Sequence, residues 1–333
     1  MKNWIIDGHQ DISSNSLNAT GKDFWQYNRL DHNAFNDTPA LGQCDYPRLQ
    51  RGDVKIVFSV IFPLQWVNGE CQHTQEACLA ETRKQLAYYH QLEQKSEGKV
   101  RILRAKADLD YVLNTEDAVG LFLLLEDASA ISPELTELQE LYESGLRAIG
   151  PVWNLDNHFG GGTNTDNGIT EHGKNLLQKM QELGVVLDTA HMNPTTFTDS
   201  LTLFDGTIIN SHTCTRALHE HRRNLSDEQL QMLVRKDAVV GCAFVPEFLH
   251  SPLEDARMAD VLKHIDHMVQ VMGIEHVALG SDFDGMSWPQ YLPDLKDNAD
   301  MQHLAAMINQ VYGKGSMALL RDNWLRVLRE TLR

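Results

Sequence analysis

Acidic and imidazole side chains follow the apolar runs of this sequence. The motif "HQD" follows the first run, and further acidic and imidazole residues stand at the ends of later runs. The candidate residues are His9, Asp11, Glu126, His191, His212 and Asp282. Imidazole nitrogens and carboxylate oxygens suit zinc or a similar divalent ion. A lone histidine at a strand end is more often structural than ligating, so the prediction rests on the coincidence of these residues. Together they predict a metal site.

The first run carries more polar groups than a buried strand usually does. The stretch "IIDGHQD" places Asp7, His9 and Asp11 at alternate positions. Alternate residues of a strand share one face, so these side chains are expected to point the same way, inward in a barrel. Unpaired buried charge is costly, and a bound cation would neutralise it.

The elements that must position these groups alternate between strand and helix. Most of the apolar runs are continuous, which is typical of strands buried on both faces. They cover residues 4–7, 54–62, 120–126, 146–153, 184–191, 206–212, 238–245 and 275–284. Segments with apolar residues at helical spacing cover 76–94, 133–145, 171–184, 226–237 and 258–273. Eight such repeats predict the α/β class and a closed (β/α)8 TIM barrel, with an open doubly wound sheet as the alternative.

The carboxyl ends of all strands in such a barrel meet at one mouth, so the polar strand ends are expected to converge there. A ninth run, near 99–105, is interpreted as an accessory edge strand. The connection from about 12 to 52 is far longer than usual and rich in Asn, Asp and Gly, which predicts a lid or a substrate-facing insertion. No linker, composition break or repeat is visible, so one domain is expected over 1–333.

Composition narrows the classes of partner. A formal net charge of -17, without a basic stripe, argues against nucleic acid. No apolar run reaches the roughly 20 residues that span a bilayer, and the N-terminal stretch "MKNWIIDGHQD" lacks a signal peptide's apolar core. The five cysteines form no CxxC pair or regular spacing, which fits a reducing compartment. A cytoplasmic protein that binds neither nucleic acid nor membrane is expected.

Several motifs resemble the renal or membrane dipeptidase family of zinc peptidases, peptidase family M19, within the amidohydrolase-type metal barrels. They are "DGHQD", "CDYPRLQRGDVKIVFSV", "LLLED", "LDTAH", "INSHT" with "RRN" farther on, "LGSDFDG" and "NWLRVL". They span nearly the whole chain in the family's order, which is more specific than any one of them. The resemblance implies a TIM barrel of the metallo-dependent hydrolase type.

The family's metal site would fall on residues already singled out. The resemblance implies two divalent metal ions, in the family Zn²⁺, with His9, Asp11 and Glu126 on one ion and Glu126, His191 and His212 on the other. Glu126 would then bridge the pair. Two ions held in this way can share a water, yield a bridging hydroxide near neutral pH and polarise the scissile carbonyl.

The resemblance also assigns roles to residues beyond the ligands. Asp282 would take a proton from the attacking water and pass it to the leaving amine; Asp284, with the same facing, is the alternative. Arg223 would bind the terminal carboxylate of the substrate through two parallel hydrogen bonds. One departure is Trp153, which stands where well-known members have a histidine that contacts the substrate. Trp153 is expected to be a pocket wall or a core residue. The nearby His158 is the alternative imidazole, but a flexible-loop histidine with no partner is the favoured interpretation of it.

These expectations favour a metal-dependent dipeptidase that cleaves dipeptides with a free C-terminal carboxylate and tolerates a D-residue there, as the family often does. One alternative keeps the metal barrel and changes the substrate to an N-acyl amino acid, a cyclic amide or a lactone. Others are a catalytically silent metal- or peptide-binding barrel and a metal-free α/β protein. Members of this family commonly form dimers, so the resemblance also implies a homodimer.

Overall fold

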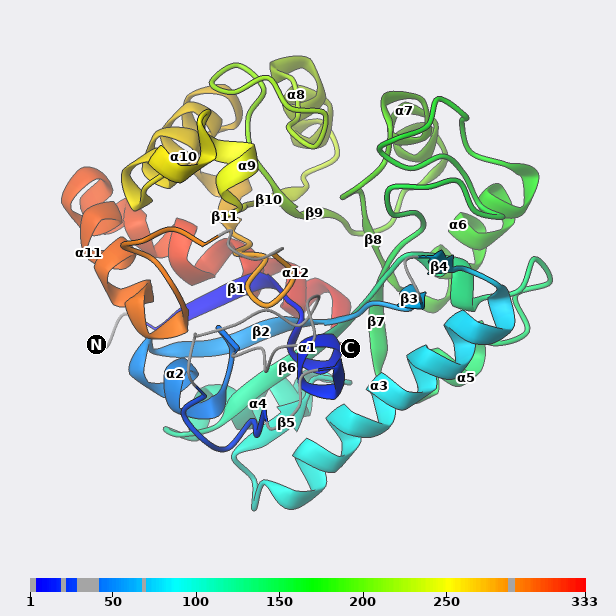
Figure 1. Ribbon diagram of the computed structural model, residues 1–333, viewed down its shortest axis with the longest axis horizontal. Helices are drawn as coiled ribbons and strands as arrows, with labels where there is room; N and C mark the ends of the chain where they lie inside the picture. The colour runs from blue at the N-terminus through cyan, green and yellow to red at the C-terminus, as the bar shows by residue number, and fades with distance from the viewer. Residues whose placement is uncertain (1–3, 19–21, 29–41, 68–69, 287–290) are drawn as a thin grey trace.

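A computed structural model describes residues 4–18, 22–28, 42–67, 70–286 and 291–333 of the chain. Its parallel strands form a closed ring with helices around it (Figure 1). The ring strands are β1 (Ile5–Gln10), β2 (Val54–Ile61), β6 (Val119–Glu126), β7 (Leu146–Gly150), β8 (Val186–Asp188), β9 (Ile208–Thr213), β10 (Val239–Cys242) and β11 (Val277–Leu279). They pair in this order, and β11 pairs back with β1. Closure confirms the predicted (β/α)8 barrel and rules out the open sheet.

Helices surround the ring of strands (Figure 1). They are α3 (Gln75–Lys95), α4 (Lys106–Asn114), α5 (Leu138–Glu143), α6 (Glu171–Leu183), α7 (Pro194–Leu203), α8 (Asp227–Val234), α9 (Pro246–Leu249), α10 (Met258–Met272), α11 (Met301–Tyr312) and α12 (Asn323–Thr331). Four of them, α3, α6, α7 and α8, begin at a residue whose side chain caps the helix. At α6, for example, Thr170 accepts a hydrogen bond from the amide of Gly173, and Gly184 ends the helix at φ 71°. Among the described residues, no helix is long and apolar enough to cross a membrane.

A short extra strand, β5 (Val100–Ile102), lies outside the ring. It pairs with the beginning of β6, at Val119 to Leu121, whereas β7 pairs with the later part from Leu123 onward. This arrangement confirms the accessory edge strand expected near 99–105. An antiparallel pair, β3 (Gln65–Val67) and β4 (Glu70–Gln72), follows β2 and was not expected from the sequence.

The ring is filled by inward-facing apolar side chains such as Ile6, Phe58 and Phe122. Trp324 enters this interior from α12, fully buried, and its indole N–H donates to the carbonyl of Leu279 at 2.8 Å. Gly8 leaves room for it, because a Cβ at that position would lie 2.5 Å from the indole ring. The segment "NWLRVL" therefore completes the barrel core from the far end of the sequence.

The predicted insertion, 12–52, is described in part; residues 19–21 and 29–41 lie outside the described residues. It contains α1 (Ile12–Asn18) and α2 (Tyr46–Arg51). Arg48, buried in α2, forms ion pairs with Asp45 and, at 2.7 Å, with Asp297. Lys22 pairs with Asp284, so the insertion is tied to the segment after β11 at two places. A lid function for it stays a prediction.

Candidate metal centre

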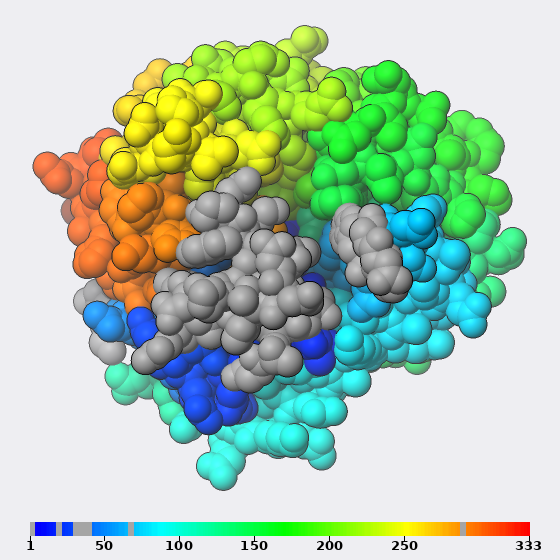
Figure 2. Space-filling model, in the orientation of Figure 1, coloured from blue at the N-terminus to red at the C-terminus, as the bar shows by residue number. Residues whose placement is uncertain are grey.

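The predicted metal-binding side chains meet at the carboxyl ends of the strands. His9, Glu126 and His212 lie within β1, β6 and β9, and Asp11 follows β1 directly. His191 and Asp282 lie in the loops after β8 and β11, each with φ 64°. Non-glycine residues adopt this left-handed conformation at a cost of order 1–3 kcal/mol, and such strain is concentrated at functional sites. Around this mouth the space-filling view shows segments from distant parts of the sequence side by side (Figure 2).

Two β-bulges aim the histidines. Asp7 pairs with Val57 and Gln10 with Ser59, so β1 holds one residue more than β2 over this stretch. In β9, Asn210 pairs with Val240 and Thr213 with Cys242, which again leaves one extra residue. Such bulges re-aim side chains next to active sites. They break the strict alternation on which the expected facing of the first strand rested.

The bulge in β1 separates Asp7 from the residues with which it was expected to act. Its carboxylate accepts hydrogen bonds from the backbone amide of Ser281 at 2.8 Å and from the side-chain amide of Gln10 at 2.6 Å. The expectation that Asp7 shares a face with His9 and Asp11 is therefore wrong, because the extra residue turns it toward Gln10. Asp7 supports the joint between β1 and the loop after β11.

His9 forms the centre of one group of ligand atoms. Its Nε2 lies 3.5 Å from Asp11 Oδ2, 3.6 Å from Glu126 Oε2 and 3.8 Å from Asp282 Oδ1. His9 Nε2 and Asp11 Oδ2 are buried and have no hydrogen-bond partner among the described residues. Gly285 permits this approach, because a Cβ there would lie 2.3 Å from Asp282 and 2.5 Å from Asp11. Buried atoms of this kind call for a bound cation.

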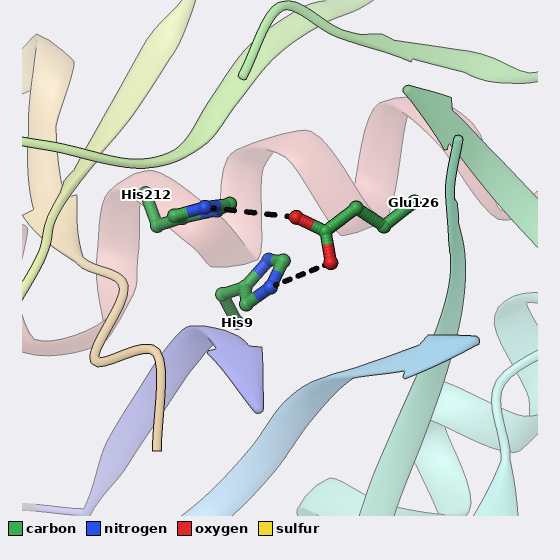
Figure 3. Close-up of side chains that lie close together, drawn as sticks. All are labelled: His9, Glu126 and His212. Atoms are coloured by element: carbon green, nitrogen blue, oxygen red, sulfur yellow. Dashed lines mark ion pairs between the residues drawn. The ribbon is translucent and has the colours of Figure 1, made fainter. Parts of the chain in front are cut away.

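The other carboxylate oxygen of Glu126 faces a second group. Its Oε1 lies 2.9 Å from His191 Nε2 and 3.7 Å from His212 Nε2, and these two nitrogens are 3.0 Å apart. Figure 3 shows the carboxylate of Glu126 facing the neighbouring rings of His9 and His212, with a different oxygen turned toward each. This division of one carboxylate between two sets of imidazoles is the geometry of a bridging ligand. The residues present therefore fit the predicted donor set of two ions.

The three imidazoles present the same ring atom to the centre. Each has its Nε2 among the carboxylates, whereas its Nδ1 is held from behind. Nδ1 of His191 lies 2.9 Å from the side-chain oxygen of Asn154, and Nδ1 of His9 and His212 lie 3.1 and 2.9 Å from the hydroxyl of Ser211. Metal-ligating histidines are commonly oriented in this way.

Burial and mutual charge set the proton affinities in the cluster. Burial raises the pKa of Asp282 to about 8 and that of Asp11 to about 6. Burial also acts to raise the pKa of Glu126, but His9 and His191 outweigh it, and that pKa falls below its usual value. Burial lowers the pKa of His191 to about 3, which favours the neutral imidazole that ligates metals.

Beside the cluster lies a cavity of about 600 Å³. Its walls beyond the ligand set include Phe62, Trp153, Arg223, Val245, Phe248 and Met286. The Trp153 ring centroid is 5.7 Å from that of His191 and 5.3 Å from that of Phe62, so Trp153 is a pocket wall, one of the two expectations for it. Arg223 is 93% buried, and its Nε has no hydrogen-bond partner among the described residues.

Two candidate residues are placed outside the cluster. Asp284 accepts hydrogen bonds from the backbone amide of Gln43 at 2.6 Å and from Asn15 at 2.8 Å, and it pairs with Lys22. Its carboxylate is thus occupied in anchoring the insertion, which favours Asp282 over Asp284 as the catalytic aspartate. His158 is exposed and does not line the cavity, so it does not replace the family's histidine.

Sequence reasoning did not single out Ser211 or Asn154. Both lie beside residues that drew attention, Ser211 before His212 in "NSH" and Asn154 after Trp153 in "VWN". Small polar residues next to a suspected histidine are too common to be informative. The hydrogen bonds to Nδ1 identify them only once the rings are placed.

The closed barrel and the histidine–carboxylate cluster at its mouth are those of a (β/α)8 barrel of the metal-dependent hydrolase type. The family model for membrane dipeptidase, peptidase family M19, matches residues 1–333, and the chain belongs to this family. Membership confirms the resemblance inferred from the motifs. The protein is therefore a hydrolase of a metallopeptidase family, and its candidate metal residues lie where the barrel strands end.

Individual relatives agree with this assignment. An uncharacterized Klebsiella pneumoniae protein encoded in the pqqA 5' region is 33% identical over 262 residues, 74% of this chain and 94% of its own. Dipeptidase aclJ of Aspergillus oryzae is 25% identical over 304 residues, 89% of this chain and 71% of its own. A solved Rhodobacter sphaeroides metallopeptidase, bound to a phosphinate mimic of the dipeptide L-Ala-D-Ala, matches with a TM-score of 0.87 at 24% identity, covering 98% of this chain and 99% of that one.

Proposed function

We propose that this protein hydrolyses dipeptides that have a free C-terminal carboxylate, including those with a D-residue at that position, and that it uses two zinc ions. The observation that carries the proposal is the division of Glu126, whose Oε2 faces His9 and whose Oε1 faces His191. Family membership supports the reaction class. The ligand of the Rhodobacter relative supports the D-residue.

The ligand sets follow from the two groups of atoms. His9, Asp11 and Glu126 would hold one ion, and Glu126, His191 and His212 would hold the other. When bound, such a pair of ions lowers the pKa of a water and polarises a carbonyl. Neutral His191 and ionised Glu126 are the protonation states that this role requires.

Asp282 is proposed to transfer a proton from the attacking water to the leaving amine. Its Oδ1 lies among the ligand atoms, 3.8 Å from His9 Nε2, and it lines the substrate cavity. Burial and the nearby carboxylates of Asp11 and Glu126 raise its pKa, so the carboxylate readily accepts a proton. It would take that proton from the attacking water and deliver it to the nitrogen of the leaving amine.

Arg223 and the apolar residues that line the cavity would determine which substrates bind. The guanidinium is buried at the cavity, and its Nε–H has no hydrogen-bond partner in the described part of the chain, which suits binding of a substrate carboxylate. Trp153, Phe62 and Met286 would contact the side chains of the dipeptide. Because tryptophan offers one N–H donor and an apolar face, this wall favours an apolar side chain.

Removal and return of metal tests the proposal. Protein stripped with a chelator should lose hydrolysis of L-Ala-D-Ala and L-Ala-L-Ala and regain it with zinc, with two ions per chain by elemental analysis. The same panel should include N-acetyl-alanine, a cyclic amide and a lactone. Activity that survives stripping would refute the metal mechanism, and hydrolysis of only the non-peptide substrates would replace the dipeptidase assignment.

A further inference from the structure

Ser211 lies where the two groups of metal-binding residues meet. It is fully buried in β9, at the bulge that precedes His212. Its Oγ is 3.1 Å from Nδ1 of His9 and 2.9 Å from Nδ1 of His212. One hydroxyl therefore contacts the rear of a histidine from each proposed ligand set.

A third partner fixes the direction of these hydrogen bonds. The Ser211 side chain also lies at the carboxylate of Asp188: burial raises the pKa of that carboxyl, and a hydrogen bond from Ser211 counteracts the rise. A serine hydroxyl has one proton to donate and two lone pairs to accept with, whereas an ionised carboxylate only accepts. When Asp188 is ionised, the proton of Ser211 goes to Asp188, and both lone pairs of the hydroxyl accept from the two Nδ1–H groups.

This balance settles which ring nitrogen each histidine offers to the centre. With Nδ1 carrying a hydrogen toward Ser211, the Nε2 of His9 and of His212 is the atom available to a metal. Those are the atoms that face Glu126, at 3.6 and 3.7 Å. The hydroxyl thus selects the ligating nitrogen in both sets at once.

The acceptor at the base of this network is itself held firmly. Asp188 Oδ1 accepts from the backbone amides of Ser211 at 2.9 Å and Ala190 at 3.1 Å, and its side chain is buried at the end of β8. The chain of contacts runs from Asp188 through Ser211 to both imidazoles. Of these four residues, only His212 lines the cavity.

We propose that Ser211, anchored by Asp188, is a positioning residue that fixes His9 and His212 together and so couples the two metal sites. The proposal rests on the ligand sets of the proposed function. Asn154 provides the contrast, because its side-chain oxygen holds Nδ1 of His191 alone. Loss of Ser211 should therefore weaken both sites, whereas loss of Asn154 should weaken one.

Zinc titration of the chelator-stripped protein tests this difference, with competition against a chelator to resolve the two binding steps. Ser211→Ala should lower the affinity of both steps by about 10- to 100-fold, and Asn154→Ala that of one step by a similar factor. Thr189→Ala is the matched control, because Thr189 has a buried hydroxyl at the same strand ends, which donates to the carbonyl of Ile209 and accepts from the side-chain amide of Asn210. Its zinc affinities should equal those of the wild type.

A second readout separates positioning from general loosening. In zinc-loaded protein with ¹⁵N-labelled histidine, the Nδ1–H signals of His9 and His212 should be protected from exchange. Ser211→Ala should abolish that protection at both while His191 keeps it. Should Ser211→Ala fail to fold, Asp188→Asn serves instead, because an amide that donates to Ser211 Oγ would displace one Nδ1–H and weaken at least one step.

The outcomes divide clearly. The coupling is overturned if a folded Ser211→Ala protein has both zinc affinities within twofold of the wild type, or if only one of its two binding steps is weakened. If Ser211→Ala does not fold, unchanged zinc affinities in Asp188→Asn overturn the coupling. A wild-type protein that binds no zinc would instead refute the proposed function. The inference is supported if the wild type binds zinc normally and Ser211→Ala weakens both zinc-binding steps. The variant should also lose exchange protection at the Nδ1–H groups of both His9 and His212, and at no other histidine.

Discussion

Nη2 of Arg223 lies 2.7 Å from Nε2 of His212. The guanidinium therefore stands against the second group of ligand atoms, where a substrate held by its carboxylate would present its peptide bond. Its face packs on the ring of Phe248 at 5.4 Å, which holds the plane of the guanidinium. This contact places the residue proposed to bind the substrate carboxylate directly beside the proposed metal site.

Replacement of Arg223 by Lys should preserve the charge and lose the paired hydrogen bonds. Hydrogen bonds to charged groups contribute about 1.5–3 kcal/mol, so kcat/KM for dipeptides should fall by about 10- to 100-fold. Steady-state kinetics with L-Ala-D-Ala and its C-terminal amide provide the measurement. The amide should be a poor substrate for both proteins; an equal loss on the amide would show that Arg223 does not read the carboxylate.

Replacement of Asp282 by Asn should remove the proton acceptor and keep the shape of the site. General acid–base catalysis contributes about 10²- to 10⁴-fold, so kcat should fall by that factor while zinc content stays at the wild-type value. Kinetics and elemental analysis on the same preparation check this. If Asp282→Asn keeps its turnover and Asp284→Asn loses it, the catalytic role passes to Asp284.

Replacement of Gly8 by Ala should strain the barrel interior. The new methyl group would lie 2.5 Å from the indole of Trp324 and 3.0 Å from the carbonyl of Leu279. Overpacking of this kind costs about 1–3 kcal/mol of unfolding free energy. Denaturant unfolding of Gly8→Ala, Trp324→Phe and the double variant measures it. The smaller phenylalanine should recover part of the Gly8→Ala loss, and strictly additive effects would contradict the predicted contact.

His264 should make the protein sensitive to acid. It accepts a hydrogen bond from the amide of Thr215 and its other ring nitrogen donates to the carbonyl of Leu249, both at 3.1 Å, and burial lowers its pKa from 6.5 to about 4. The folded state thus favours the neutral ring. The resulting stability is present above pH 6.5 and is lost as the pH falls through 4.

Comparison of wild type with His264→Gln measures this contribution. A pKa difference of that size corresponds to about 3 kcal/mol. Unfolding free energies between pH 7 and 4 should therefore decline more steeply in the wild type than in the variant. Parallel declines would show that His264 titrates alike in the folded and unfolded chains.

The strands were predictable because each is an apolar run long enough to be buried on both faces, as "GLFLLLE" is in β6. The convergence of Glu126, His191 and His212 followed from the topology, since all parallel strands end at one mouth. The bulges at His9 and His212 were not predictable, because one extra residue in a pairing leaves no mark on composition or periodicity. For this reason the prediction that Asp7 shares a face with His9 and Asp11 was wrong.

Roles that depend on exact placement were also hidden from the sequence. Asp282 and Asp284 share a motif and a facing, and only the partners of Asp284, Lys22 and Gln43, tell them apart. Ser211 and Asn154 have no signature at all, since their function depends on which atom of a distant ring they meet. The short helices α1 and α2 were likewise missed within a segment that reads as a loop.

The packing of Trp324 against Gly8 has a consequence for biosynthesis. The first strand carries His9 and is synthesised long before α12, whose Trp324 packs against Gly8 on the inner face of that strand. Until α12 is in place, the apolar inner face of the first strand and the proposed metal-binding residue His9 are incompletely covered. We therefore expect metal binding to follow the packing of α12 into the barrel.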